Sequence, residues 1–126
     1  MMKKEKLPDT ELRVMQAIWH MDAPASTSEI REKLQKERPW NLSALQTLLG
    51  RLVGRGFLST EKNGKNRYYT PLVAEEAYLA EDSRRYFQKW QGGTLRDLVA
   101  CLYESRSVTR ADLEELKAFI EQETKE

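Results

Sequence analysis

Hydrophobic residues recur at every third or fourth position along two stretches near the start of the chain, which predicts two amphipathic helices. The first begins at Pro8-Asp9, and its apolar positions are Leu12, Met15, Ile18 and Trp19. The second follows Ser26 and Glu29, which have the spacing of a capping box, where each side chain satisfies a free backbone N–H of the other residue. It stops before Pro39 because proline disfavours a helical residue ahead of it.

A third helix is predicted from Asn41, a favourable N-cap residue, to Gly56, which suits the left-handed conformation that often follows a helix. Its apolar side consists of Leu45, Leu48, Leu49, Leu52 and Val53. The other side is small and uncharged apart from Arg51, and its remaining members are Ser43, Gln46, Thr47, Gly50 and Gly54.

Two short strands, near residues 57–61 and 67–71, are predicted after this helix. Asn63-Gly64 indicates a tight hairpin turn between them, since both residues tolerate positive φ. The ionic groups of residues 39–72 are unbalanced, with Glu61 against Arg51, Arg55, Lys62, Lys65 and Arg67. A helix with a small polar face followed by a basic hairpin is typical of a winged helix-turn-helix, which reads a nucleic-acid groove and holds its phosphates.

Residues 74–126 predict three more helices. One runs to Gln91 and is broken at Gly92-Gly93, a second follows the N-cap residue Thr94, and the third begins with a capping-box pair at Thr109. Short helices with full apolar stripes are marginal alone, so we expect these stripes to be buried against a second copy of the chain. The residues expected in this dimerisation surface are Tyr78, Leu79, Tyr86, Phe87, Trp90, Leu95, Leu98, Leu102, Leu113, Leu116, Phe119 and Ile120.

The predicted fold is therefore mainly α with a small β-hairpin wing. Residues 1–73 are expected to form a winged-helix DNA-binding domain, and residues 74–126 a three-helix dimerisation domain. Charge supports this division. The net charge of the chain is +1, but the first segment holds 13 Lys and Arg against 8 Asp and Glu, giving +5, whereas the second holds 8 against 12, giving −4. Such asymmetry favours an N-terminal half that meets a polyanion.

The bulk composition is that of an ordinary soluble protein, with 126 residues, 40% hydrophobic and 33% charged. No apolar run approaches the roughly 20 residues of a membrane span. The basic N-terminus lacks the apolar segment of a secretory signal. A single cysteine, Cys101, excludes an intramolecular disulfide and a multi-thiolate zinc site within one chain. We expect a cytoplasmic protein without a membrane partner.

The third helix and the hairpin supply the candidate DNA contacts. A major groove about 12 Å wide admits one helix, whose first turns reach base edges. Side chains expected to read bases are Ser43, Gln46 and Thr47, with Ala44 facing a thymine methyl group. Arg51, two turns further on, is expected to hold the DNA backbone, as are the wing residues Lys62, Lys65 and Arg67. The alternative is a protein-interaction module that uses the same fold without specific DNA binding, for which the wing has no need to be basic.

Candidate chemistry for catalysis is sparse. The only histidine, His20, has no serine, aspartate or cysteine partner in a recognisable arrangement, and carboxylate pairs such as Glu75-Glu76 fall in solvated helical stretches. We therefore expect no enzyme activity, no cofactor and no metal. Cys101 lies inside an apolar helical stripe and is expected to be a small buried hydrophobe.

From Leu7 to about Ile120 the sequence resembles the penicillinase repressors, the BlaI/MecI/CopY-like winged-helix regulators. The resemblance rests on three runs: LPDTELRVMQAIW in the first helix, W-x-x-x-x-L-x-TLL-x-RLV-x-RGFL from Trp40 to Leu58, and RYYTPLV from Arg67 to Val73. It implies a dimeric transcriptional repressor whose winged helix reads each half of a dyad operator. The third helix is then the recognition helix, and its DNA-facing positions are Asn41, Ser43, Ala44, Gln46, Thr47 and Arg51. Relatives often carry threonine where Ala44 stands, so this chain lacks a hydroxyl there.

The resemblance does not extend to a release mechanism. Antibiotic-responsive members are cleaved at an Asn-Phe bond in the dimerisation helices, and the matching positions here are Cys101-Leu102. Copper-responsive members bind metal through paired cysteines near the C-terminus, which this chain lacks. Release from the operator would therefore depend on an unidentified protease or effector.

Overall fold

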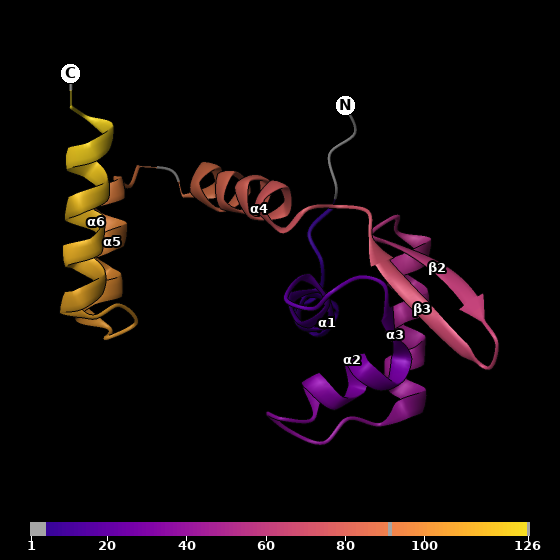
Figure 1. Cartoon of the computed structure of the whole chain (residues 1–126). Helices are drawn as coiled ribbons and strands as arrows, with labels where there is room; N and C mark the ends of the chain where they lie inside the picture. Colours follow the sequence, from indigo (N-terminus) through magenta and orange to yellow (C-terminus); the bar gives the residue numbers. More distant parts are fainter. Residues whose placement is uncertain (1–4, 91, 126) are drawn as a thin grey trace. The chain divides into compact units, whose positions relative to one another are not determined.

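A computed structural model describes residues 5–90 and 92–125 of the chain (Figure 1). The Cα positions group into two compact units, residues 1–86 and residues 87–126. The described residues form six α-helices and a three-stranded antiparallel sheet, as the predicted fold class requires. Gln91, the expected end of the fourth helix, and the first residues of the basic N-terminus lie outside the described residues.

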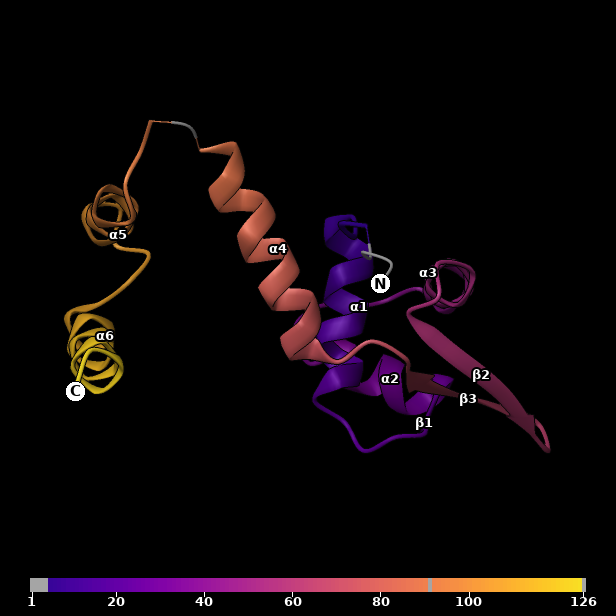
Figure 2. The same ribbon diagram turned by 90° about the horizontal axis from the view of Figure 1, so that it is seen from above.

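The first unit opens with two helices and a short strand that the sequence pattern missed. Helix α1 spans Asp9–Trp19 and helix α2 spans Thr27–Leu34. The predicted capping box at α2 is confirmed, since the Ser26 hydroxyl accepts from Glu29 N–H and the Glu29 carboxylate accepts from Ser26 N–H. Strand β1, Ala25–Ser26, pairs with the third strand and places the start of α2 beside the sheet (Figure 2).

Helix α3 spans Leu42–Gly54 and begins at the predicted N-cap, Asn41. It ends as predicted, because Gly56 takes a left-handed φ of 82° and Phe57 turns back to donate its N–H to the Leu52 carbonyl. Helices α1 to α3 enclose one core with the sheet, and its members include Val14, Met15, Ile18, Ile30, Leu34, Leu45, Leu49, Leu52, Phe57, Leu58 and Tyr69.

Strands β2 (Leu58–Asn63) and β3 (Asn66–Pro71) form the predicted hairpin, and β3 lies between β1 and β2. The turn differs from the prediction by one residue. Asn63 pairs with Asn66, so the two turn residues are Gly64 and Lys65 rather than Asn63 and Gly64. Gly64 at the first turn position has a φ of 66°, a place that glycine occupies in type II′ turns. The hairpin projects from the helices in both views (Figures 1 and 2).

Helix α4 spans Glu75–Lys89 and starts within the first unit. Compact packing therefore continues to Tyr86, beyond the domain boundary expected after residue 73. Tyr78, expected in the dimerisation surface, is instead buried in the core of the first unit. Its ring centroid lies 5.8 Å from those of Trp19 and Phe57, so the first turns of α4 complete the apolar core.

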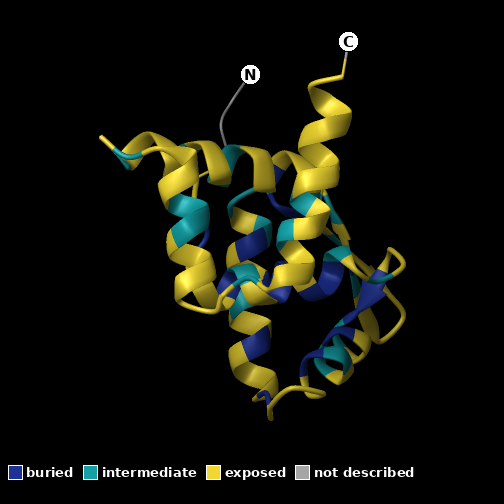
Figure 3. Ribbon diagram, turned by 90° about the vertical axis from the view of Figure 1, so that its left-hand side faces the viewer, coloured by how far each residue is buried: buried dark blue, intermediate teal, exposed yellow. Residues whose placement is uncertain are grey.

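Helices α5 (Leu95–Glu104) and α6 (Arg110–Glu123) belong to the second unit, and both begin at the predicted caps, Thr94 and Thr109. The buried residues, dark blue in Figure 3, belong to the first unit, and α5 and α6 contain none. Among the described residues, no helix is long and apolar enough to cross a bilayer.

Candidate nucleic-acid interface

The first two turns of α3 present polar side chains to solvent because the opposite side of the helix is fixed in the core. Leu45, Leu49 and Leu52 are fully buried, which leaves the alternate face of the helix outward. All of the α3 residues predicted to contact DNA are exposed, namely Asn41, Ser43, Ala44, Gln46, Thr47 and Arg51. The structure therefore brings the predicted reading residues onto one accessible face.

Two of these side chains also serve the helix itself. The Asn41 carboxamide oxygen accepts from Ala44 N–H at 3.0 Å and caps the helix, so the amide group that it can offer to a ligand is its NH₂. The Thr47 hydroxyl donates to the Ser43 carbonyl at 3.1 Å, which leaves the hydroxyl oxygen as an acceptor. The Gln46 side chain has no hydrogen-bond partner among the described residues, so its carboxamide oxygen and NH₂ group are both free for a base edge.

The wing places its cations on the paired part of the hairpin and at its tip. Lys62 stands opposite Arg67 across β2 and β3, and Lys65 lies in the turn. The Arg67 guanidinium donates to the Thr60 hydroxyl at 3.3 Å, which holds it beside β2. All three cationic residues are exposed. This arrangement suits contact with an extended line of phosphates.

A groove of about 420 Å³ lies between α3 and the hairpin, lined by Thr27, Gln46, Gly50, Val53, Thr60, Arg67 and Tyr69. Gln46 and Arg67, predicted for different tasks, therefore share one surface. Thr27, the first residue of α2, is a member of the groove that the sequence prediction missed. Its signal was the capping box, which fixes where α2 begins and so where its free N–H groups point.

The cationic residues of this surface differ in whether they form ion pairs with acidic residues of the protein. Within the described residues, Arg51, Lys62, Lys65 and Arg67 have no ion pair, so their charge is available to a polyanion. Arg55, counted with them in the sequence, is different. Its guanidinium pairs with Glu11 and with Glu5, each at 2.9 Å. Arg55 therefore belongs to the internal packing of the unit.

The capping box at α2 also carries a shift in acidity. The Ser26 backbone N–H, with the Ser26 hydroxyl as a second contributor, lowers the pKa of the Glu29 carboxyl below its ordinary value. The charged form is thus favoured at neutral pH, where a carboxylate suits the positive end of the helix dipole.

A second surface, on α5 and α6, is apolar. It is a groove of about 570 Å³ lined mainly by Leu95, Val99, Ala100, Tyr103, Leu113, Leu116, Phe119 and Ile120. Of the residues predicted for dimerisation, those that are exposed are Leu79, Tyr86, Phe87, Leu95, Leu102, Phe119 and Ile120. Those that are half-buried are Trp90, Leu98, Leu113 and Leu116.

Cys101 differs from its prediction. It was expected to be a small buried hydrophobe, but its side chain is exposed on α5. Leu102 beside it is also exposed. The apolar stripe of α5 is therefore exposed at this point.

Helices α2 and α3, followed by a projecting β-hairpin with exposed cations, define a winged helix-turn-helix protein. The sequence profile described as penicillinase repressor matches residues 7–122, a span that includes both compact units. The chain therefore belongs to the penicillinase repressor family, a family of transcriptional repressors rather than enzymes.

Individual relatives agree with this assignment. The penicillinase repressor of Bacillus licheniformis is 30% identical over 97% of this chain and 94% of its own length. The methicillin resistance regulatory protein MecI of Mammaliicoccus sciuri is 30% identical over 94% and 95%. Among solved structures, the DNA-binding domain of the repressor BlaI is 36% identical, with a TM-score of 0.53 over 62% of this chain and 94% of that domain. The monomeric form of B. licheniformis BlaI bound to the blaP half-operator is 36% identical with a TM-score of 0.51, over the same shares.

Proposed function

We propose that the protein is a transcriptional repressor that binds a dyad DNA operator as a homodimer, with one winged helix on each half-site. The observation that carries this proposal is the groove that Gln46 of α3 shares with Arg67 of the wing. A helix that enters the major groove with this face would bring the wing against the adjacent backbone. One continuous surface would then make both the base contacts and the phosphate contacts.

Within this surface the roles follow from side-chain chemistry. Gln46 can form two hydrogen bonds with adenine N6 and N7, and Ala44 can contact a thymine methyl group. Ser43 and Thr47 can accept or donate at a base edge or a phosphate. Arg51, Lys62, Lys65 and Arg67 would hold the backbone, because phosphate contacts depend on charge and fix the protein's register.

Dimerisation is proposed from the second unit. A unit of 40 residues whose two full helices bury no side chain exposes too much apolar surface to be stable by itself. The α5–α6 groove, with the exposed ring of Phe119 in its lining, can be buried against the same surface of another copy. An isologous contact of this kind gives the protein the two-fold symmetry that a dyad operator mirrors.

The solved relative supports the assignment of one winged helix to one half-site, because it is a monomeric form of BlaI in complex with a half-operator. Release from DNA would require a protease or an effector that acts on this arrangement. Membership of the penicillinase repressor family, together with a content of 33% charged residues, supports a cytoplasmic protein that binds DNA and catalyses no reaction.

The deciding experiment is selection of double-stranded DNA from a random pool by the full-length protein at about 150 mM salt. We expect enrichment of an inverted repeat. The selected duplex and a scrambled duplex of equal length and composition are then compared by gel shift. Equal affinity for the two would contradict specific binding and favour a protein-interaction module.

The spacing of the repeat tests the dimer. Half-sites read by one rigid dimer lie about one helical turn apart or a multiple of it. Insertion of about 5 base pairs at the centre turns one half-site to the opposite face of the duplex, whereas insertion of about 10 restores its direction. We expect the first insertion to reduce affinity to that of a single half-site. Indifference to both insertions would contradict the proposed dimeric operator complex.

A further inference from the structure

The recognition helix is held at its start by an arginine of the preceding helix. The Nε–H of Arg31 in α2 donates to the backbone carbonyl of Trp40 at 3.0 Å. That carbonyl immediately precedes Asn41, the N-cap of α3, so the contact fixes the point at which the helix begins. The Trp40 side chain is buried, and the guanidinium of Arg38 lies 5.0 Å above its ring. The entry to α3 is thereby tied to both α2 and the core.

The other end of the same helix is held by a second arginine. Arg55 is the C-cap of α3, and its Nε lies 2.9 Å from Glu11 Oε1 of α1. Its Nη1 lies 2.9 Å from Glu5 Oε1, in the segment that leads into α1. One guanidinium can thus pair with two carboxylates: it donates a hydrogen bond to Glu5, and it meets Glu11 Oε1 as an ion pair without hydrogen-bond geometry. The end of α3 is thus joined to the first helix and its approach.

The two side chains of the Arg55–Glu11 pair are buried to different extents. The Glu11 side chain is 3% exposed, whereas that of Arg55 is 30% exposed. A buried carboxylate without a cation is strongly destabilising, so Glu11 requires Arg55 at this place. Arg55 is consequently committed to the protein and is not free for a phosphate.

The position of α3 matters because base contacts tolerate little displacement. Its 13 residues make a helix about 20 Å long, so a rotation of about 6° about its midpoint moves each end by about 1 Å. Hydrogen bonds to a base edge are made within a range of about 0.5 Å. Ser43 lies about 7 Å along the axis from the helix midpoint, so the same rotation would move it by about 0.8 Å, which is more than this range allows.

We propose that Arg31 and Arg55 are positioning residues that set the orientation of α3 and so determine sequence specificity, without touching DNA. This inference rests on the proposed function, because it assumes that α3 reads bases. Its distinguishing consequence is that loss of either contact lowers discrimination between sequences more than it lowers attraction to DNA in general.

The test uses the full-length protein, the duplex selected by the unaltered chain and its scrambled counterpart. Arg31→Gln and Arg55→Gln remove the two contacts, and Glu11→Gln removes the second from the opposite side. We expect the ratio of affinities for selected over scrambled duplex to fall about tenfold in each. The slope of log affinity against log salt should stay unchanged, because no phosphate contact is lost. Arg13→Gln is the matched control, since its pair with Glu37 is exposed on both sides, and its ratio should equal that of the unaltered protein.

Glu11→Gln separates positioning from direct contact, because a buried acid cannot be a phosphate ligand. A salt slope lowered by about 0.9 in the arginine variants, with equal loss on both duplexes, would identify phosphate contacts and overturn the inference. An unchanged ratio in folded variants would overturn it as well. If Arg55→Gln does not fold, the neutral pair Glu11→Gln/Arg55→Gln takes its place, since removing both charges leaves none unpaired. Failure of the unaltered chain to select any sequence would instead overturn the proposed function, and this inference with it.

Discussion

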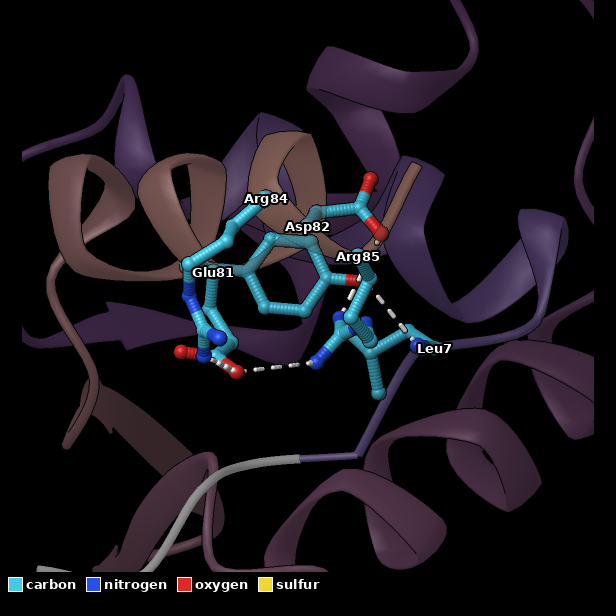
Figure 4. A network of polar contacts seen from close by, with 6 residues as sticks. Leu7, Glu81, Asp82, Arg84 and Arg85 are labelled. Atoms are coloured by element: carbon cyan, nitrogen blue, oxygen red, sulfur yellow. Dashed lines mark hydrogen bonds and ion pairs between the residues drawn. The ribbon is translucent and has the colours of Figure 1, made fainter. Parts of the chain in front are cut away.

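The hydroxyl of Tyr78 in α4 accepts a 2.9 Å hydrogen bond from the backbone N–H of Leu7, 71 residues earlier in the chain. Figure 4 shows this contact beside an ionic network in which Arg84 and Arg85 pair with acids of the same helix. Arg85 also lies 5.9 Å above the Tyr78 ring. The start of α4 is therefore a structural part of the winged-helix unit.

We predict that Tyr78→Phe destabilises the first unit by about 1–3 kcal/mol, because the buried N–H of Leu7 loses its acceptor while the ring keeps its packing. Urea unfolding of the full-length protein measures this change. Tyr86→Phe is the control, since that ring is exposed, and its stability should match that of the unaltered chain. Sedimentation equilibrium should give the same oligomeric state for all three. A loss of association in Tyr78→Phe without loss of stability would restore Tyr78 to the dimerisation surface.

Sequence patterns predicted best what is determined locally. The caps at Ser26, Asn41, Thr94 and Thr109 were all recognised, because a capping side chain bonds to the backbone within three residues of itself. The buried stripe of α3 was equally legible, since its period is that of a helix packed on one side.

What the sequence did not reveal depends on distant partners. Strand β1 has two residues and exists through its pairing with β3, so no periodicity could indicate it. The side of α4 that Tyr78 occupies is decided by Trp19 and Phe57. The sequence places Arg55 among the cations of residues 39–72 but does not reveal its pairing, because its partner Glu11 lies on another helix. In the candidate site, the sequence predicts the exposed polar face of α3, whereas Thr27 lines the same groove only because the fold brings α2 there.

Gly50 gives a prediction in which stability and binding change in opposite directions. It lies in the middle of α3, and a Cβ placed there would meet no atom within 4 Å. Gly50→Ala should therefore stabilise the protein by about 1 kcal/mol through helix propensity. If DNA approaches the backbone here, the added methyl group should weaken operator binding about tenfold.

Gly54 is the matched control for this substitution, because it is also exposed on α3 and equally open, but lies one turn further from the reading residues. Gly54→Ala should leave operator affinity unchanged. Thermal unfolding and gel shift of the two variants provide the comparison. Full operator affinity in Gly50→Ala would show that glycine is not needed for close approach at this position.

Substitutions of Lys65 and Gln46 should change DNA binding in different ways. Lys65→Ala removes a charge from the wing tip, so it should weaken binding to all duplexes alike and lower the log-salt slope by about 0.9. Gln46→Ala removes a base contact and should relax preference at one base pair, at a cost of about 1–3 kcal/mol for the selected base. Lys117→Ala, on α6, is the charge control and should preserve the slope. Equal weakening of every sequence by Gln46→Ala would exclude a role in base reading.

The Glu29 carboxyl predicts a pH-dependent contribution to stability. Its pKa is lowered in the folded protein because Ser26 hydrogen-bonds the charged form. The stabilisation that Glu29 contributes is therefore complete above the pKa that its carboxyl has in the unfolded chain, about 4.3 for a free glutamate. It is lost as the pH falls through the lower pKa that the carboxyl has in the folded protein. Glu29→Gln should be less stable than the unaltered protein at pH 7, and this difference should shrink as the pH falls below about 4.3. Urea midpoints measured from pH 7 downward test it, and a difference that is constant with pH would contradict it.

Phe119 provides the test of the proposed dimer. Its ring is 61% exposed and lines the α5–α6 groove, so a charge at its tip would be buried only if a second copy covers it. Phe119→Glu should therefore be monomeric by light scattering at micromolar concentrations while its helical circular dichroism is retained. Lys117→Glu adds a carboxylate to an exposed position of the same helix that does not line the groove, and it should remain a dimer.

Because two linked half-sites bind with an avidity gain of about 10² or more, the Phe119→Glu monomer should lose this factor on the selected dyad and keep its affinity for a single half-site. A Phe119→Glu protein that still associates would place the dimer contact elsewhere on the chain.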